Sequence, residues 1–175
     1  MKTIQEHLTQ YAAYHRDRRN IATHFVGVPM IVFSVVLALA VVVIPLGPFT
    51  TTLAVALSIA ATIYYAKLDL AIGATMAIVF FVMCALASEI TARCSDMAVL
   101  GWALAIFVVG WIIQFVGHKF EGMKPAFFDD VMGLMIGPIF VVAEFAFHMG
   151  LRGDLRGYIE ARVGPVVDRR TAHSA

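Results

Sequence analysis

The chain has 175 residues, which is the size of a single domain. Hydrophobic residues make up 61% of it and charged residues only 14%, against roughly 25% charged in a soluble domain. This composition excludes an ordinary soluble protein and indicates an integral membrane protein. The formal net charge is +1 and no basic stripe is visible in the sequence, which argues against nucleic acid as a partner.

Residues 3–19 are predicted to form a helix that is too polar to cross a bilayer. Thr3 and Glu6 have the spacing of a capping box at its start. We therefore expect an N-terminal amphipathic helix that lies on the membrane surface or packs across the mouth of a bundle. One face of this helix is marked by residues at helical spacing, namely Ile4, Leu8, Tyr11 and His15.

Five apolar segments follow, and the first four are predicted to be full membrane spans. A crossing helix needs about 20 apolar residues, because its backbone polar groups must be satisfied within the helix. The fifth segment contains Pro138, which removes a backbone hydrogen bond, so we expect it to be kinked or re-entrant. The predicted fold is an all-α helical bundle in a membrane. Its predicted segments are residues 26–44, 50–66, 70–88, 97–116 and 131–149. Lys67 and Asp69 are expected to form a tight turn between the second and third segments.

The loop charges predict how the chain is oriented in the membrane. Several cations precede the first span, whereas the loop between the first two spans carries no charge. The N-terminus is therefore expected to be cytoplasmic. An even number of spans separates His24 from His118, so counting across the membrane places His15, His24 and His118 on one face.

These three histidines are a candidate metal site, because imidazole is a common ligand for several metals. Nine residues of unbroken helix would rotate by about 900° and leave His15 and His24 on opposite sides, so the chain must bend between them. We expect Asn20 to cap a helix that runs from Ile21, with His24 in its first turn. The alternative is that each is an ordinary histidine at the membrane interface.

A second group of polar residues lies at the end of the fourth span. Gln114, His118 and Glu121 are spaced four and three residues apart, so they share one helical face. A histidine and a glutamate at this spacing are a common way to present two metal ligands from one helix. The alternative is a solvated helix end in which Lys119 or Lys124 forms an ion pair.

The remaining polar residues are given smaller roles. Glu144 lies in the apolar fifth segment, where it is expected to orient a ligand histidine or to pair with an arginine. Residues 129–130 are aspartates that are expected to cap the fifth helix. His7 and His173 are expected to be exposed, and the role of His148 is open.

Three separated motifs occur in order between Tyr11 and Phe147. The first is Tyr11-x3-His15-x4-Asn20-x3-His24-x2-Gly27-x-Pro29. The second is Gln114-Phe115-x-Gly117-His118-x2-Glu121-x3-Pro125-Ala126. The third is Gly137-Pro138-x-Phe140-x3-Glu144. In this hydrophobic context the motifs resemble those of the Mpo1-like family of membrane proteins.

The resemblance implies a function and a ligand set. Characterised fungal members of the family are iron(II)-dependent dioxygenases of the endoplasmic reticulum that convert 2-hydroxy fatty acids to fatty acids one carbon shorter. By carry-over, the iron ligands would be His15, His24 and His118. Glu121 is the first choice for a fourth ligand, and a further histidine such as His148 is a weaker choice.

The same resemblance extends to residues beside the metal. Asn20, Gln114 and Lys119 are the candidate catalytic residues. Lys119, Arg16 or Arg19 would hold the carboxylate of the substrate, because cationic side chains bind carboxylates.

Under this interpretation the cofactor is Fe2+ and the partners are a long-chain 2-hydroxy fatty acid, O2 and membrane lipid, with an oligomer also possible. Frequent Ala, Val, Gly and Arg favour a bacterial inner membrane with the site on the cytoplasmic face, or the endoplasmic reticulum if the protein is eukaryotic. The alternatives are a structural subunit, a metal-binding membrane protein or a small transporter. A transporter needs a polar path through the midplane, which the four full spans largely lack.

Overall fold

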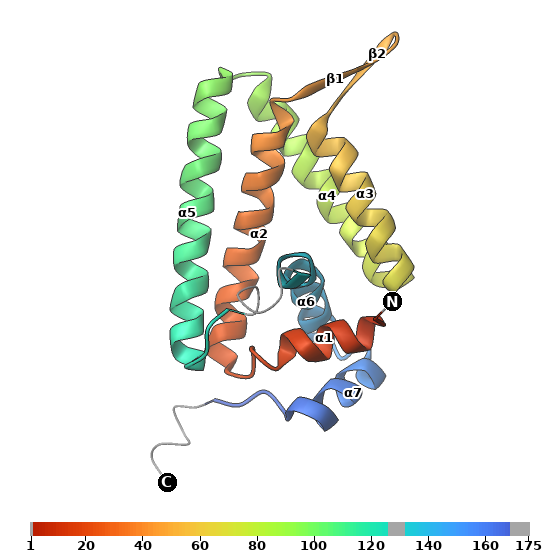
Figure 1. Cartoon of the computed structure of the whole chain (residues 1–175), viewed down its shortest axis with the longest axis vertical. Helices are drawn as coiled ribbons and strands as arrows, with labels where there is room; N and C mark the ends of the chain where they lie inside the picture. The colour runs from red at the N-terminus through yellow and green to blue at the C-terminus, as the bar shows by residue number, and fades with distance from the viewer. Residues whose placement is uncertain (1, 126–131, 169–175) are drawn as a thin grey trace. The chain divides into compact units, whose positions relative to one another are not determined.

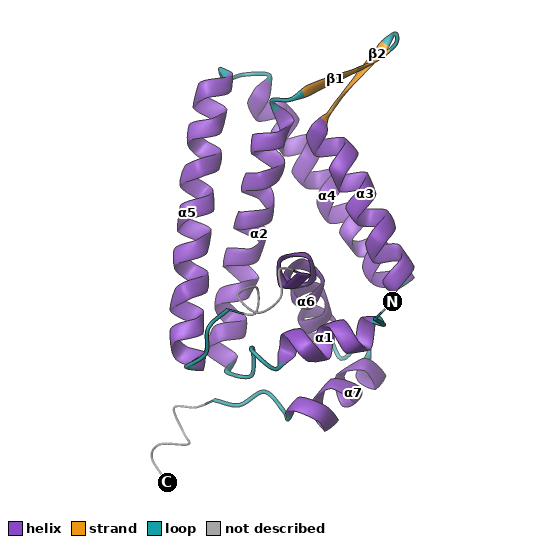
Figure 2. Ribbon diagram, viewed as in Figure 1, coloured by secondary structure: helices purple, strands orange, loops and turns teal. Residues whose placement is uncertain are grey.

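The computed structural model of the chain describes residues 2–125 and 132–168 (Figure 1). Within these ranges there are seven helices and one antiparallel pair of strands (Figure 2). The helical class is therefore confirmed, and the two strands are an element that the sequence did not predict. The chain divides into two compact units, Met1–Pro29 with Trp111–Ala175 and Met30–Gly110.

The first unit begins with α1, Ile4–Ala12. Its predicted capping box is confirmed: the Glu6 amide donates to Thr3 Oγ1 at 3.2 Å, and the Thr3 amide donates to Glu6 Oε2 at 2.7 Å. The helix packs against α6 and α7 of the same unit (Figure 1). The prediction of a helix as far as residue 19 is wrong, because the chain leaves the helix after Ala12. A location of α1 on the membrane surface remains a prediction.

The second helix, α2, comprises Arg18–Ala40 and starts earlier than the sequence predicted. Asp17 precedes it, and its Oδ1 accepts a hydrogen bond from the Arg19 amide at 2.8 Å. The prediction that Asn20 caps a helix starting at Ile21 is therefore wrong, because Asp17 already satisfies an amide at the helix start. His24 consequently lies in the second turn of α2 and not in the first.

The second unit contains a hairpin followed by a pair of helices. Strand β1, Val43–Leu46, pairs with β2, Phe49–Thr52, and Gly47 between them has a φ of 60°. The predicted span at 50–66 is therefore misplaced at its start, since α3 comprises Leu53–Leu68. The predicted tight turn after α3 is confirmed: Asp69 ends that helix and accepts from the Ile72 amide of α4, Leu70–Thr91, at 3.0 Å.

The last three helices are α5, Asp96–Glu121, α6, Met132–His148, and α7, Gly153–Val163. The α6 helix continues through Pro138, and a bend of 111° separates α6 from α7. The sharp change of direction thus comes after His148 and not at the proline. Residues 129–131 and His173 lie outside the described residues.

Among the residues that the structure describes, three helices are long and apolar enough to cross a membrane, namely α2, α4 and α5. The bent pair α6–α7 is a fourth candidate, whereas α3 is apolar but has only 16 residues. A helical membrane protein with three to four candidate spans is therefore supported among the described residues. The count of four full spans and a re-entrant fifth segment remains a prediction.

Candidate metal centre

The side chains of His15, His24 and His118 meet inside the first unit. They are buried, with 0%, 2% and 5% of their surfaces exposed. Each offers a ring nitrogen, and these three nitrogens lie within 4.8 Å of one another. Across residues 2–125 and 132–168 no other group of His, Cys, Asp and Glu meets this criterion. The predicted convergence of the three histidines is thus confirmed.

Two of the imidazoles are oriented by backbone carbonyls four residues earlier in the chain. His15 Nδ1 lies 2.7 Å from the Tyr11 carbonyl oxygen, and His24 Nδ1 lies 2.8 Å from that of Asn20. A carbonyl oxygen only accepts hydrogen bonds, so both Nδ1 atoms carry a hydrogen. In the neutral rings the Nε2 atoms then carry the lone pairs that bind metals.

The two Nε2 atoms face each other at 2.9 Å. Two lone pairs at this distance repel each other unless a cation lies beside them. Burial, followed by the neighbouring His24, lowers the pKa of His15 well below its ordinary value, which disfavours a proton as that cation. A metal ion would fit better, because two nitrogens that each bind the same ion at about 2.1 Å lie within about 4 Å of each other. The donor set therefore suits a metal with an imidazole-rich site and open positions.

Aromatic side chains form one wall of the metal centre. The Tyr11 ring stacks on His15 with centroids 4.2 Å apart and planes 4° apart, and Phe140 of α6 lies 5.3 Å from the same imidazole. A Cβ on Gly137 would come within 3.1 Å of the Tyr11 hydroxyl, so this glycine allows α6 to approach α1 closely. Burial raises the pKa of Tyr11, which keeps the phenol protonated. The third sequence motif therefore contributes to the wall of the metal centre.

Glu121 connects the end of α5 to the start of α2. Its Oε2 accepts hydrogen bonds from the amides of Arg16 and Asp17, at 3.0 and 2.8 Å, and from Asn20 Nδ2 at 3.0 Å. Glu121 is 1% exposed, and it does not belong to the group of ligand atoms within 4.8 Å. Its role as a fourth ligand therefore remains a prediction, whereas its contacts hold the turn that follows α1.

The three candidate catalytic residues lie in different surroundings. Asn20 is fully buried, and its carbonyl and amide groups contact His24 and Glu121. Gln114 is 3% exposed, and neither atom of its amide has a hydrogen-bond partner in the described part of the chain. Lys119 is exposed at the end of α5. The structure thus brings Asn20 beside the metal centre and leaves Gln114 with a buried, unsatisfied amide.

Gly117 belongs to the second motif but was given no role from the sequence. A Cβ at this position would collide with Thr23 Oγ1 and would come within 2.6 Å of Asn20 Oδ1. Gly117 therefore allows α5 to pack against the turn of α2 that precedes His24. A small residue one position before His118 was the available signal.

For the remaining ionisable residues, the structure confirms one prediction and contradicts another. Glu144 forms an ion pair with Arg16 at 3.7 Å, which is one of its two predicted roles. His7 is only 9% exposed, so the prediction that it is exposed is wrong, because α1 lies between α6 and α7 and its inward face is covered. His148 donates its Nδ1 hydrogen to the Glu144 carbonyl at 3.0 Å and is not in the histidine cluster.

All of these residues lie in the part of the chain that matches a known family. A family model described as 2-hydroxy-palmitic acid dioxygenase Mpo1-like matches residues 1–149. The chain is also 30% identical over 159 residues to the 2-hydroxy-palmitic acid dioxygenase MPO1 of Saccharomyces cerevisiae. This similarity covers 90% of the chain and 87% of the yeast protein. No solved structure matches the chain.

Proposed function

The chain belongs to the Mpo1-like family, and on this premise we propose that it is an iron(II)-dependent dioxygenase of long-chain 2-hydroxy fatty acids. The product is a fatty acid one carbon shorter. A 2-hydroxy acid and O2 together contain the atoms of the shorter acid, CO2 and one water. The reaction therefore balances without a separate reductant.

The observation that carries this proposal is the pair of Nε2 atoms facing each other at 2.9 Å, with His118 beside them. In the proposal His15, His24 and His118 hold the iron, which supplies O2 activation and open positions for the substrate. Three protein ligands leave room for both the acid and O2. Backbone carbonyls already fix two of the rings in the tautomer that binds a metal.

The residues around the ligands have distinct proposed roles. Gln114 lies one helical turn before His118, and its unsatisfied amide is proposed to meet the polar end of the substrate. Asn20 and Glu121 position the ligands, because they connect the His24 turn to the end of α5. Lys119 is proposed to attract the carboxylate from its exposed position.

The proposal is tested by metal analysis and turnover of the detergent-purified full chain. We expect about one iron per chain, and we expect 2-hydroxyhexadecanoate to give pentadecanoate with consumption of O2. Substrate labelled with 13C at its carboxyl carbon should release labelled CO2. Protein that leaves the 2-hydroxy acid unchanged when loaded with iron would overturn the proposal in favour of a non-catalytic metal-binding protein. Protein that carries no iron would overturn the proposed iron site itself.

Variants separate the proposed ligands from their neighbours. His15→Ala, His24→Ala and His118→Ala should each lose iron and turnover, whereas His148→Ala, outside the cluster, should retain iron. Gln114→Leu should keep iron and fold normally, because an unsatisfied amide is replaced by an apolar group of similar size. Its kcat/KM should fall about fivefold, since a neutral hydrogen bond contributes about 1 kcal/mol. Full activity in Gln114→Leu would remove that residue from the site.

A further inference from the structure

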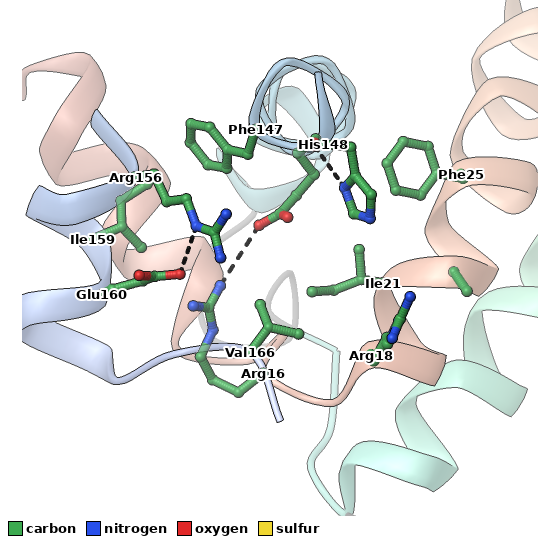
Figure 3. A pocket seen from close by; sticks show the side chains of 12 residues that line it. Arg16, Arg18, Ile21, Phe25, Phe147, His148, Arg156, Ile159, Glu160 and Val166 are labelled. Atoms are coloured by element: carbon green, nitrogen blue, oxygen red, sulfur yellow. Dashed lines mark hydrogen bonds and ion pairs between the residues drawn. The ribbon is translucent and has the colours of Figure 1, made fainter. Parts of the chain in front are cut away.

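The first unit contains a cavity of about 570 Å3 that is separate from the metal centre. Its size is typical of a site for a small ligand. Ile21 and Phe25 line it from α2, whereas Asn20 and His24 lie one position earlier and therefore about 100° around the same helix. We call this cavity the arginine pocket, after the three arginines in its wall, Arg16, Arg18 and Arg156 (Figure 3).

Arg16 is the buried cation of the arginine pocket, with 7% of its surface exposed. Its Nε donates to the carbonyls of Ala12 and His15 at 2.9 Å, and its Nη1 donates to that of Gly164 at 3.0 Å. Its Nη2 is buried and has no hydrogen-bond partner among the described residues, because Glu144 lies 3.7 Å away. A buried N–H without an acceptor is rare in folded proteins, so Nη2 indicates that an acceptor is missing from the pocket.

The charges that line the arginine pocket favour an anion. Three arginines face two carboxylates, those of Glu144 and Glu160, so the cations among these five side chains exceed the anions by one. Glu144 contacts Arg16, and Glu160 accepts from Arg156 Nε at 2.8 Å, so each carboxylate is paired. A ligand with a single negative charge would balance the lining.

Apart from His148, the rest of the wall is apolar. Phe25, Phe147 and Ile159 are among the lining residues, and Figure 3 shows the two phenylalanines on either side of the His148 ring, with Arg16 and Arg18 below it. A cavity lined by both cationic and apolar side chains suits a ligand that has an anionic head and a hydrocarbon body. In a membrane protein such a ligand is an acyl lipid.

We propose that the arginine pocket binds the singly charged head group of an acyl lipid, with Arg16 Nη2 as the buried donor. Two sources share this chemistry: the carboxylate of a free fatty acid and the phosphodiester of a phospholipid. Guanidinium groups bind both kinds of anion through paired N–H donors. This site does not need the metal, and the proposal does not rest on the proposed function.

The test measures binding to the metal-stripped full chain in detergent. Radiolabelled hexadecanoate and radiolabelled phosphatidylglycerol are the two probes, and hexadecanol is the uncharged competitor. At least one probe should bind with about one molecule per chain, and hexadecanol should not displace it. The probe that binds identifies the source of the head group. His118→Ala should bind equally well, which separates this site from the metal centre.

Two arginine variants and a matched control decide the outcome. Arg156→Gln should weaken probe binding about tenfold, whereas Arg162→Gln should not, because Arg162 is also exposed on α7 but packs over the Tyr158 ring and does not line the pocket. Arg16→Gln should weaken binding at least as much, but it also removes three hydrogen bonds to backbone carbonyls. Arg156→Gln leaves these three hydrogen bonds in place and is therefore the more informative variant.

Three results would overturn the proposal. The first is that neither probe binds the wild-type chain. The second is that hexadecanol displaces the bound probe as well as the unlabelled anion does, since the head-group charge would then be irrelevant. The third is that Arg156→Gln and Arg162→Gln bind the probe with equal affinity.

Discussion

Hydrogen bonds to the backbone orient two of the three imidazoles of the metal centre before any ion binds. Tyr11 lies in the last turn of α1, where carbonyl groups lack partners within the helix, and its oxygen accepts from the His15 ring. Asn20 lies inside α2, and its oxygen accepts from the His24 ring and the Thr23 hydroxyl. Each ring is therefore oriented by the backbone carbonyl four residues before it.

Glu121 is the residue for which the sequence and the structure point to different roles. We predict that Glu121→Gln keeps iron, because its amide oxygen can still accept from the Arg16 and Asp17 amides. Glu121→Ala should lower the free energy of unfolding by about 3 kcal/mol or more, because it leaves several buried donors without an acceptor. Thermal unfolding and iron content of the two purified variants provide the measurement.

The two variants also discriminate between the positioning role and the ligand role. A direct ligand would make Glu121→Gln lose iron while its thermal stability stays near that of the wild type. This outcome would restore the carboxylate to the ligand set that the sequence predicted. Loss of stability in Glu121→Ala alone would support the positioning role.

At the scale of the elements, the approach of α5 to α2 depends on Gly117. We predict that Gly117→Ala destabilises the protein by about 1–3 kcal/mol, because the new Cβ collides with Thr23 and crowds Asn20. Its affinity for iron should fall as well, since the same turns carry His24 and His118. Unfolding in detergent and equilibrium iron binding check both effects.

A glycine in the same helix provides the matched control. Gly101→Ala places its Cβ where no atom of the described residues lies within 4 Å, so it should stabilise the helix by roughly 0.5–1 kcal/mol. Combining Gly117→Ala with Thr23→Ala removes the nearest obstacle and should recover part of the loss. If the two glycine variants behave alike, the close packing at Gly117 does not support the metal centre.

The boundaries of the elements show which features of the fold are encoded locally. The capping box at Thr3 and Glu6 and the turn at Asp69 were predicted correctly, because each depends on residues three positions apart. The end of α1 was not predicted correctly, since the pattern of residues at helical spacing continues past Ala12. The chain can leave the helix there because Glu121 accepts from the amides of Arg16 and Asp17, more than a hundred residues away.

The same distinction applies to the candidate site. The three histidines were identified because polar residues at the ends of apolar segments stand out, and counting spans placed them together. The burial of Arg16 was not predicted, since in sequence it is one of several cations before the first span. Its contacts to Gly164 and Glu144 come from α6 and the segment after α7, which no local pattern connects to it.

At the scale of the whole molecule, the histidine cluster constrains the path through the membrane. His24 near the start of α2 and His118 near the end of α5 belong to one cluster. If both helices cross the membrane, Ala40 and Asp96 at their other ends therefore lie on the opposite side from the cluster. If α4 crosses the membrane, α3 must cross as well, because an even number of crossings has to connect the end of α2 to the start of α5. With 16 residues α3 is about 24 Å long, against a hydrocarbon core of about 30 Å, a mismatch that bilayers accommodate at modest cost.

We therefore predict that the two ends of α4 lie on opposite sides of the membrane. In a Cys84→Ser background, the exposed Cys94 after α4 is the single native target for a membrane-impermeant maleimide. A second variant in the same background replaces Cys94 with serine and carries Lys67→Cys at the exposed end of α3. In sealed vesicles of known orientation, one of these cysteines should react directly and the other only after the vesicles are opened.

The charge rule assigns the Lys67 side to the cytoplasm. Labelling of both cysteines from one side would show that α3 and α4 form a re-entrant pair. In that case α2 and α5, which hold His24 and His118, would be the helices that cross the bilayer.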